Sequence, residues 1–159
     1  MARLFDRRVG MMNPRGIDMI FDGVPGAERE AARRAMLFAA SCGFSEAQIE
    51  DVNTAVEEAC RNAIEHTLPD STVRGIRMVC SFVERVLVID IQSGGNPFVV
   101  PERKPNLRAK IEGREPPRGW GLYLIRTLAD RVEFDQKPGT LSVKMTFAIK
   151  PVRKTSVRS

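Results

Sequence analysis

The longest regular pattern in this chain is a helical one, which begins after Ser45 and gives way to strand-like alternation from Val73 onward. Ser45 is suited to the N-cap position, and Gln48 three residues later completes a capping box. The pattern ends at about His66, before the helix-breaking Leu68-Pro69-Asp70. Its apolar residues recur at helical spacing: Ile49, Val52, Ala55, Val56, Ala59 and Ala63. The chain is therefore expected to combine a long amphipathic helix with strands.

Local patterns predict the remaining elements. The Ala-rich segment Ala27–Ser41 is expected to be a helix closed by Cys42-Gly43, because glycine tolerates the left-handed position after a helix. A further helix is expected at Leu122–Ala129. Tight turns at Glu84-Arg85 and Pro138-Gly139 indicate hairpins. Strands are predicted at Ile17–Phe21, Gly75–Val83, Val86–Ser93, Arg131–Gln136 and Thr140–Lys150.

The order helix, helix, hairpin, loop, helix, hairpin predicts an α+β fold, with helices on one face of a mixed, mostly antiparallel sheet. Residues 17–150 are expected to form one domain, with an irregular lead-in at 1–16 and a basic tail at 151–159. Strand alternation predicts which side chains face inward. These are Leu87, Ile89, Ile91 and Ser93 in one strand, opposite Val88, Asp90 and Gln92, and Leu141, Val143, Met145, Phe147 and Ile149 in the closing strand.

Composition excludes several classes of protein. The 159 residues, 43% hydrophobic and 28% charged, suit one globular domain with a real core. No apolar run approaches the roughly 20 residues of a membrane span, and the N-terminus has no apolar secretion signal. We therefore expect a cytoplasmic protein without a membrane partner. The net charge of +5 is spread along the chain with few interleaved aromatic residues, so direct nucleic-acid binding is not expected.

The cysteines and the histidine do not suggest a metal centre. Cys42, Cys60 and Cys80 are scattered without CxxC spacing, and buried thiols are the expected state. A single histidine, His66, excludes a site built from several imidazoles. His66 lies near a helix C-terminus, where a favourable end charge or a packed ring is the alternative to a place in a binding pocket.

Glu58 and Asn62 are candidates for chemistry because they lie four residues apart on the long helix. This spacing places both side chains on one face, about one turn apart. A carboxylate can accept a proton from an attacking hydroxyl, and an amide oxygen can hold Mg²⁺. The alternative is a solvated helix face, although asparagine is a mediocre residue for a helix interior.

Glycines flank two further segments that could contact a ligand. QSGGNPF, residues Gln92–Phe98, ends an inner strand, and RGWGLYLI, residues Arg118–Ile125, opens a helix. Glycine allows close approach of the backbone, and free N–H groups at a helix N-terminus favour an anion such as phosphate. A structural turn before a helix has the same appearance. The segment 99–118 is polar and basic, and so long a connection is functional or disordered in most domains.

These segments together resemble the GHKL, or histidine-kinase-like, ATPases. EEACRNAIEH resembles their N box, QSGGNPF lies where the first glycine box is expected, and GWGLYLIRTLAD resembles the second. GTLSVKMTF resembles the closing strand of that family. The resemblance covers roughly Ile17–Ile149 and is greatest to the bacterial anti-sigma-factor serine kinases.

The resemblance implies a Bergerat-type fold, an α/β sandwich that binds Mg-ATP beneath a lid. Glu58 would be the general base, and Asn62 would hold Mg²⁺. Gly119 and Gly121 would cradle phosphates, and the basic segment Arg103–Arg118 would form the lid. The remaining residues implied to bind the nucleotide are Ala63, His66, Ser93, Gly95, Arg118 and Leu122.

The resemblance also implies partners. Such kinases phosphorylate a serine of an anti-anti-sigma, STAS-type protein, sequester a sigma factor, and usually form homodimers. One position departs from the pattern: the family has an adenine-reading aspartate where this chain has Ser93, and Asp90 faces the other side of the strand. Losing a charged acceptor is expected to cost on the order of 1–2 kcal/mol of nucleotide affinity. The alternative function is therefore a regulator that acts by protein contact with weak or no ATP binding.

Overall fold

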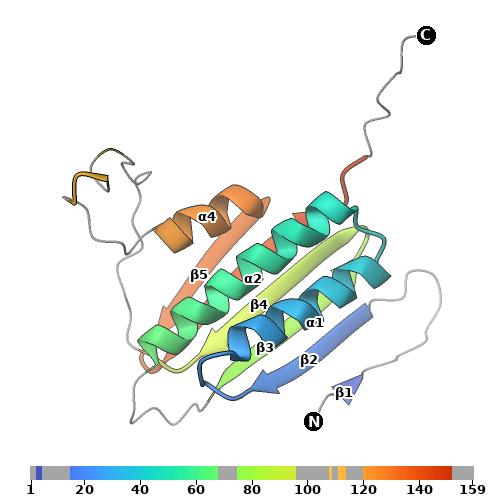
Figure 1. Cartoon of the computed structure of the whole chain (residues 1–159). Coiled ribbons are helices and arrows are strands. Elements are labelled where there is room, and N and C mark those ends of the chain that lie inside the picture. Colours follow the sequence, from blue (N-terminus) through green and yellow to red (C-terminus); the bar gives the residue numbers. More distant parts are fainter. Residues whose placement is uncertain are drawn as a thin grey trace.

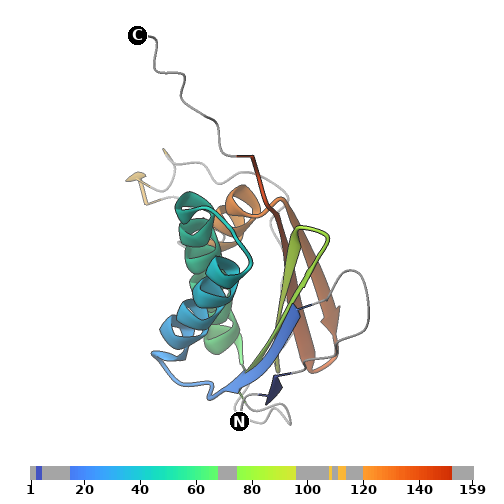
Figure 2. The same cartoon turned by 90° about the vertical axis from the view of Figure 1, so that its right-hand side faces the viewer.

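The computed structural model describes residues 3–4, 15–67, 75–95, 108, 111–113 and 120–151. The described helices pack on one face of a sheet, and the view along the sheet edge shows these two layers (Figure 2). The helices are α1 (Ala27–Ser41), α2 (Glu46–His66) and α4 (Trp120–Leu128). The strands are β1 (Arg3–Leu4), β2 (Arg15–Phe21), β3 (Ile76–Val83), β4 (Val86–Ser93), β5 (Arg131–Lys137) and β6 (Thr140–Ala148). The expected α+β class is confirmed.

The sheet has the strand order β1-β2-β3-β4-β6-β5, and each pairing between these strands is antiparallel. The turn between β3 and β4 places Glu84 and Arg85 at φ of 50° and 68°, the left-handed geometry that matches the twist of a hairpin. Strand β6 lies between β4 and β5, so Ser93 at the end of β4 pairs with Ile76 on one side and Leu141 on the other. The end of β4 is therefore an interior position of the sheet.

Helix α2 lies centrally across the sheet, with α1 on one side and α4 on the other (Figure 1). Its N-cap is Ser45, whose Oγ accepts a hydrogen bond from the Gln48 N–H at 3.3 Å. A capping box also needs the Gln48 side chain to accept a hydrogen bond from the Ser45 N–H, and this part of the prediction is wrong. The Gln48 side chain is buried and instead donates to the Ala148 carbonyl at 2.7 Å and accepts from the Lys150 N–H at 3.2 Å. Gln48 thus ties the first turn of α2 to the end of β6.

The core lies between the helices and the inner face of the sheet. The alternation predicted for β4 is confirmed, since Leu87, Ile89, Ile91 and Ser93 are buried while the residues between them are partly exposed. The thiols of Cys60 and Cys80 lie in this core, and burial raises the pKa of each to about 12. All three cysteines are free thiols, and the buried state expected from the sequence is confirmed for Cys60 and Cys80, whereas Cys42 is only partly buried.

Several boundaries differ from the sequence prediction. Strand β2 begins at Arg15, two residues early, because Arg15 and Gly16 continue the backbone pairing with β3. The Arg15 guanidinium also donates to the carbonyl of Ser41 at 2.7 Å, at the end of α1. The lead-in expected to be irregular contributes strand β1, which pairs with β2. Helix α4 begins at Trp120 rather than Leu122. No helix among the described residues has the length and apolar character needed to span a membrane.

Candidate functional site

Glu58 and Asn62 lie on one face of α2, as their spacing predicted, and the structure shows that this face lies toward the start of α4. The Glu58 side chain is only 18% exposed because it lies directly against Gly121, in the first turn of α4. A Cβ atom added to Gly121 would overlap Glu58 Oε1 and would lie 2.8 Å from its Cδ. A side chain at position 121 would therefore require the Glu58 carboxylate to move.

Arg61 holds the other side of the Glu58 carboxylate. Its Nη1 donates to Glu58 Oε2 at 2.6 Å, and its Nη2 donates to Glu57 Oε1 at 2.8 Å. Arg61 lies three residues after Glu58 and four after Glu57, which are the two spacings that bring helix side chains together. The sequence therefore contained the signal for this contact, although our sequence analysis did not use it.

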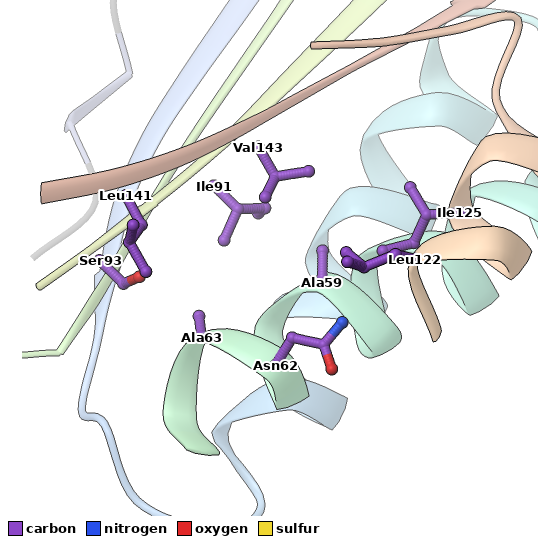
Figure 3. A pocket seen from close by; sticks show the side chains of 9 residues that line it. All are labelled: Ala59, Asn62, Ala63, Ile91, Ser93, Leu122, Ile125, Leu141 and Val143. Atoms are coloured by element: carbon purple, nitrogen blue, oxygen red, sulfur yellow. The ribbon is translucent and has the colours of Figure 1, made fainter. Parts of the chain in front are cut away.

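A small cavity opens between α2, α4 and the inner face of the sheet (Figure 3). Its volume is about 20 Å³, which is room for about one water molecule. The lining residues are mostly apolar and come from each of these elements: Ala59, Asn62, Ala63, Ile91, Ser93, Leu122, Ile125, Leu141 and Val143. Four of the predicted binding residues, Asn62, Ala63, Ser93 and Leu122, are thus brought to one place.

The polar groups of this cavity are Asn62 and Ser93, which come from opposite layers (Figure 3). Ser93 is 2% exposed, and its hydroxyl makes no hydrogen bond to any described residue. The Asn62 carboxamide likewise has no partner among the described residues, so its oxygen is available to a ligand. Asp90 does not reach the cavity, since it accepts hydrogen bonds from Gln92 and Ser142 at 2.7 and 2.5 Å on the outer face.

His66 and Gly95 meet at the C-terminal end of α2, beside this cavity but not among its lining residues. A Cβ atom added to Gly95 would lie 2.7 Å from the His66 carbonyl oxygen, and Gly95 forms a bridge with Thr67. This close packing of α2 on the end of β4 accounts for the glycine at position 95. Binding roles for His66 and Gly95 remain predictions.

The other predicted site residues, Arg118 and Gly119, lie outside the described residues, as does most of the basic segment Arg103–Arg118. Sequence reasoning did not select Ile125, Leu141 or Val143 as cavity residues. The inward alternation of β6 indicated that Leu141 and Val143 face the helices, but it could not show which helix lies opposite them.

The arrangement combines apolar walls, a carboxylate and a helix N-terminus in one place, although the cavity itself has room for about one water molecule. The cavity offers apolar walls, Glu58 offers a carboxylate that can accept a proton, and the first turn of α4 lies beside both. Within the described part of the chain, no three His, Cys, Asp or Glu side chains gather to hold a metal ion. The role of Asn62 as a ligand of Mg²⁺ stays a prediction.

The sequence of this chain is similar to those of several known proteins. The chain is 33% identical over 112 residues to the serine-protein kinase RsbW of Bacillus cereus (strain AH820), covering 65% of this chain and 66% of that protein. It is 29% identical over 110 residues to RsbW of Halalkalibacterium halodurans, again covering 66% of each. The chain thus spans slightly less than two thirds of the length of these relatives.

A crystal structure of the RsbU and RsbW domains of a Mycobacterium tuberculosis protein superposes with a TM-score of 0.66 at 17% identity. The match covers 89% of this chain and 34% of the other, and at this identity it shows the shared fold. The sequence profile of a family described as "Histidine kinase-like ATPase domain" matches residues 24–147, from before α1 to the last but one residue of β6. The chain therefore belongs to the histidine kinase-like ATPase domain family.

Proposed function

We propose that this protein is a serine-protein kinase of the anti-sigma-factor type, which binds Mg-ATP and transfers its terminal phosphoryl group to a serine of a partner protein. The observation that carries the proposal is the contact between Glu58 and Gly121. It places a carboxylate at the first turn of α4, one helical turn from Asn62 and beside an apolar cavity. Membership of the ATPase family and the RsbW relatives support the same assignment.

Each residue has a defined role in this proposal. Glu58 accepts the proton of the attacking serine hydroxyl, which makes the oxygen a better nucleophile. Asn62 binds Mg²⁺, which neutralises charge on the phosphate oxygens during transfer. The apolar walls of the cavity, including Ala63 and Leu122, hold the base. Gly119, Gly121 and Arg118 face the phosphates, and the basic segment before them closes over the nucleotide.

The partner in this proposal is an anti-anti-sigma protein of the STAS type that carries the acceptor serine. The protein also sequesters a sigma factor or a similar regulator, and it acts as a homodimer. The RsbW name of the curated relatives supports this regulatory context. Binding one partner or the other then depends on the phosphorylation state of the STAS-type protein.

A second candidate function is regulation by protein contact alone, with little or no use of ATP. Two observations favour it. Ser93 replaces the charged residue that the family uses to hold adenine, and the cavity of about 20 Å³ must widen before a base can enter. Opening the contact between α2 and α4 would consume part of the free energy of nucleotide binding, and the observed affinity for ATP would be weaker.

Isothermal titration calorimetry with Mg-ATP separates the two functions. The kinase proposal predicts saturable binding that is lost when Mg²⁺ is removed, and weakened at least tenfold in Asn62→Ala. Glu58→Gln is expected to bind Mg-ATP normally but to lose phosphate transfer from γ-labelled ATP to STAS-type proteins of the same organism. Thr127→Ala, on the exposed face of α4, is the matched control for both measurements. Absence of binding at millimolar Mg-ATP would refute the kinase proposal and leave contact regulation.

A further inference from the structure

The buried hydroxyl of Ser93 is the feature of the cavity that packing does not explain. Ser93 is 2% exposed, lines the cavity, and makes no hydrogen bond to any described residue. The other inward residues of β4 are Leu87, Ile89 and Ile91, which fill the core with apolar atoms. A buried hydroxyl without a partner costs about 1–3 kcal/mol relative to a satisfied one. The cavity has room for about one water molecule, which can satisfy the hydroxyl until a ligand group takes its place.

The walls around Ser93 define the chemistry of that ligand. None of the residues that line the cavity is charged, and the side chains nearest to Ser93 in the view of Figure 3 are Leu141 and Ala63. Such walls suit the flat, apolar faces of a heteroaromatic ring, whereas a phosphate or a sugar would leave its polar groups unpaired. Because the cavity measures about 20 Å³, a ring enters only when the contact between α2 and α4 opens. The ring would then direct one polar edge to the hydroxyl, and the phosphates would lie toward the first turn of α4.

A serine hydroxyl differs from a carboxylate in what it can recognise. A hydroxyl both donates and accepts hydrogen bonds, whereas an ionised carboxylate only accepts. Adenine carries an exocyclic amine, which is a donor, and guanine carries a carbonyl oxygen at the same position, which is an acceptor. A carboxylate would accept from adenine and repel guanine. The Ser93 hydroxyl can rotate to pair with either base.

We propose that the cavity accepts adenine and guanine nucleotides with comparable affinity, and that Ser93 is the residue that sets this breadth. This inference rests on the proposed function, because it assumes that the cavity holds the base of a nucleoside triphosphate. It adds that the phosphoryl donor is a purine nucleotide of either kind.

Calorimetric titration of the full chain with Mg-ATP, Mg-GTP and the Mg²⁺ complex of purine riboside triphosphate tests the inference. The last compound has no exocyclic group on the ring. The wild-type protein is expected to bind ATP and GTP with dissociation constants within about threefold of each other. It should bind the unsubstituted purine nucleotide at least fivefold more weakly.

Two substitutions test whether Ser93 is the residue that allows both adenine and guanine nucleotides to bind. Ser93→Asp is expected to favour ATP over GTP by at least tenfold, because the carboxylate accepts from the amine and repels the carbonyl. Ser93→Ala removes the hydroxyl without adding a buried charge, so it keeps the test valid if Ser93→Asp does not fold. In Ser93→Ala, ATP and GTP should lose their advantage over the unsubstituted nucleotide. Ser81→Asp, exposed on β3, is the charge-matched control and should change none of these ratios.

The outcomes separate this inference from the proposed function. If the wild-type protein binds ATP more than tenfold tighter than GTP, the inference is wrong and the kinase proposal stands. If Ser93→Ala retains the wild-type ratios among the three nucleotides, the hydroxyl does not read the base and the inference is also wrong. If no nucleotide binds at millimolar concentration, the kinase proposal fails and the inference fails with it.

Discussion

Glu58 is fixed from two directions, which distinguishes it from an ordinary acidic residue on a helix surface. One oxygen lies against the Gly121 backbone, and the other accepts a hydrogen bond from Arg61 at 2.6 Å. Fixing a carboxylate in one orientation removes rotamer freedom that a general base would otherwise lose during the reaction. The two contacts make separate predictions, because one is steric and the other electrostatic.

Gly121→Ala is expected to displace the Glu58 side chain while leaving the fold intact. The new Cβ would overlap Glu58 Oε1, and the flexible carboxylate can move more easily than the α4 backbone. In the wild-type background the substitution should change the unfolding free energy by less than about 1 kcal/mol, since the helix gains from alanine what the clash costs. Phosphate transfer should fall at least tenfold. Urea unfolding and γ-phosphate transfer measure the two effects.

A double-mutant cycle checks that the clash is with Glu58. In a Glu58→Ala background the overlapping atoms are gone, so Gly121→Ala should be more favourable for stability there than in the wild-type protein. A difference of about 0.5–1 kcal/mol is expected. If Gly121→Ala has the same effect in both backgrounds, the contact between these residues does not constrain Glu58.

The two ion pairs of Arg61 should each contribute little to the free energy of unfolding, and the pair with Glu58 should contribute more than the pair with Glu57. The Glu58 side chain is 18% exposed and the Glu57 side chain 30%, so solvent screens the second pair more. We expect a coupling energy of about 0.5–1 kcal/mol between Arg61 and Glu58, and a smaller one between Arg61 and Glu57. Double-mutant cycles with Arg61→Ala, Glu58→Gln and Glu57→Gln, measured at low and high salt, check this. A larger coupling to Glu57 would contradict the geometry.

The sequence predicted the residues of the site better than it predicted their contacts. Helical spacing placed Glu58 and Asn62 on one face and strand alternation turned Ser93 inward, and the structure has both arrangements. The site roles of these residues, for Ser93 implied by the family resemblance, stay predictions. The reason for Gly121 was predicted incompletely: a phosphate cradle was expected, whereas the described structure shows the glycine packed on Glu58. Such a contact joins residues 63 positions apart, and local spacing contains no information about it.

The helices and hairpins were predicted from the sequence because local signals determine them. The bounds of α1 and β4 agree with the prediction, and the Glu84-Arg85 turn is where alternation indicated it. The pairing of β4 with β6 was not predicted, since any two hairpins can join along several edges. The partner of Gln48 was missed for the same reason: its hydrogen bonds are to Ala148 and Lys150, about 100 residues away.

Gln48→Leu is expected to destabilise the protein by about 1–3 kcal/mol. Leucine fits the buried volume but leaves the Ala148 carbonyl and the Lys150 N–H without the partner that Gln48 supplies. The effect should appear as a lower midpoint of urea unfolding followed by circular dichroism. Glu50→Leu, an exposed position in the same helix, is the control and should change stability by less than about 0.5 kcal/mol. Equal effects of the two variants would show that Gln48 is not a tie between the layers.

In the described part of the molecule, one apolar core lies between the helices and the sheet. The cavity is an unfilled space within this core. Its lining comes from α2, β4, α4 and β6, so the cavity exists only when both hairpins and both helices are in place. The same core encloses the thiols of Cys60 and Cys80. Their titration therefore reports on the integrity of the core that forms the site.

The stability of the protein should fall steeply at alkaline pH because of these two thiols. In the unfolded chain they ionise near 9.0, whereas burial raises the pKa of both Cys60 and Cys80 to about 12 in the folded protein. Between these values the folded state binds more protons than the unfolded state, so stability is lost as pH rises through this window. Each thiol can contribute up to about 1.4 kcal/mol per pH unit.

Urea unfolding between pH 9 and 11 measures this slope. The Cys60→Ala/Cys80→Ala protein is expected to lose stability less steeply than the wild-type protein, even though its stability at pH 7 is lower because two buried side chains are shortened. Cys42→Ala is the control, because Cys42 is only partly buried and should alter the slope less. If the double variant has the wild-type slope, the two thiols are accessible to solvent. The apolar layer between α2 and the sheet would then be looser than the structure shows, and the small cavity beside it would already be open to a base.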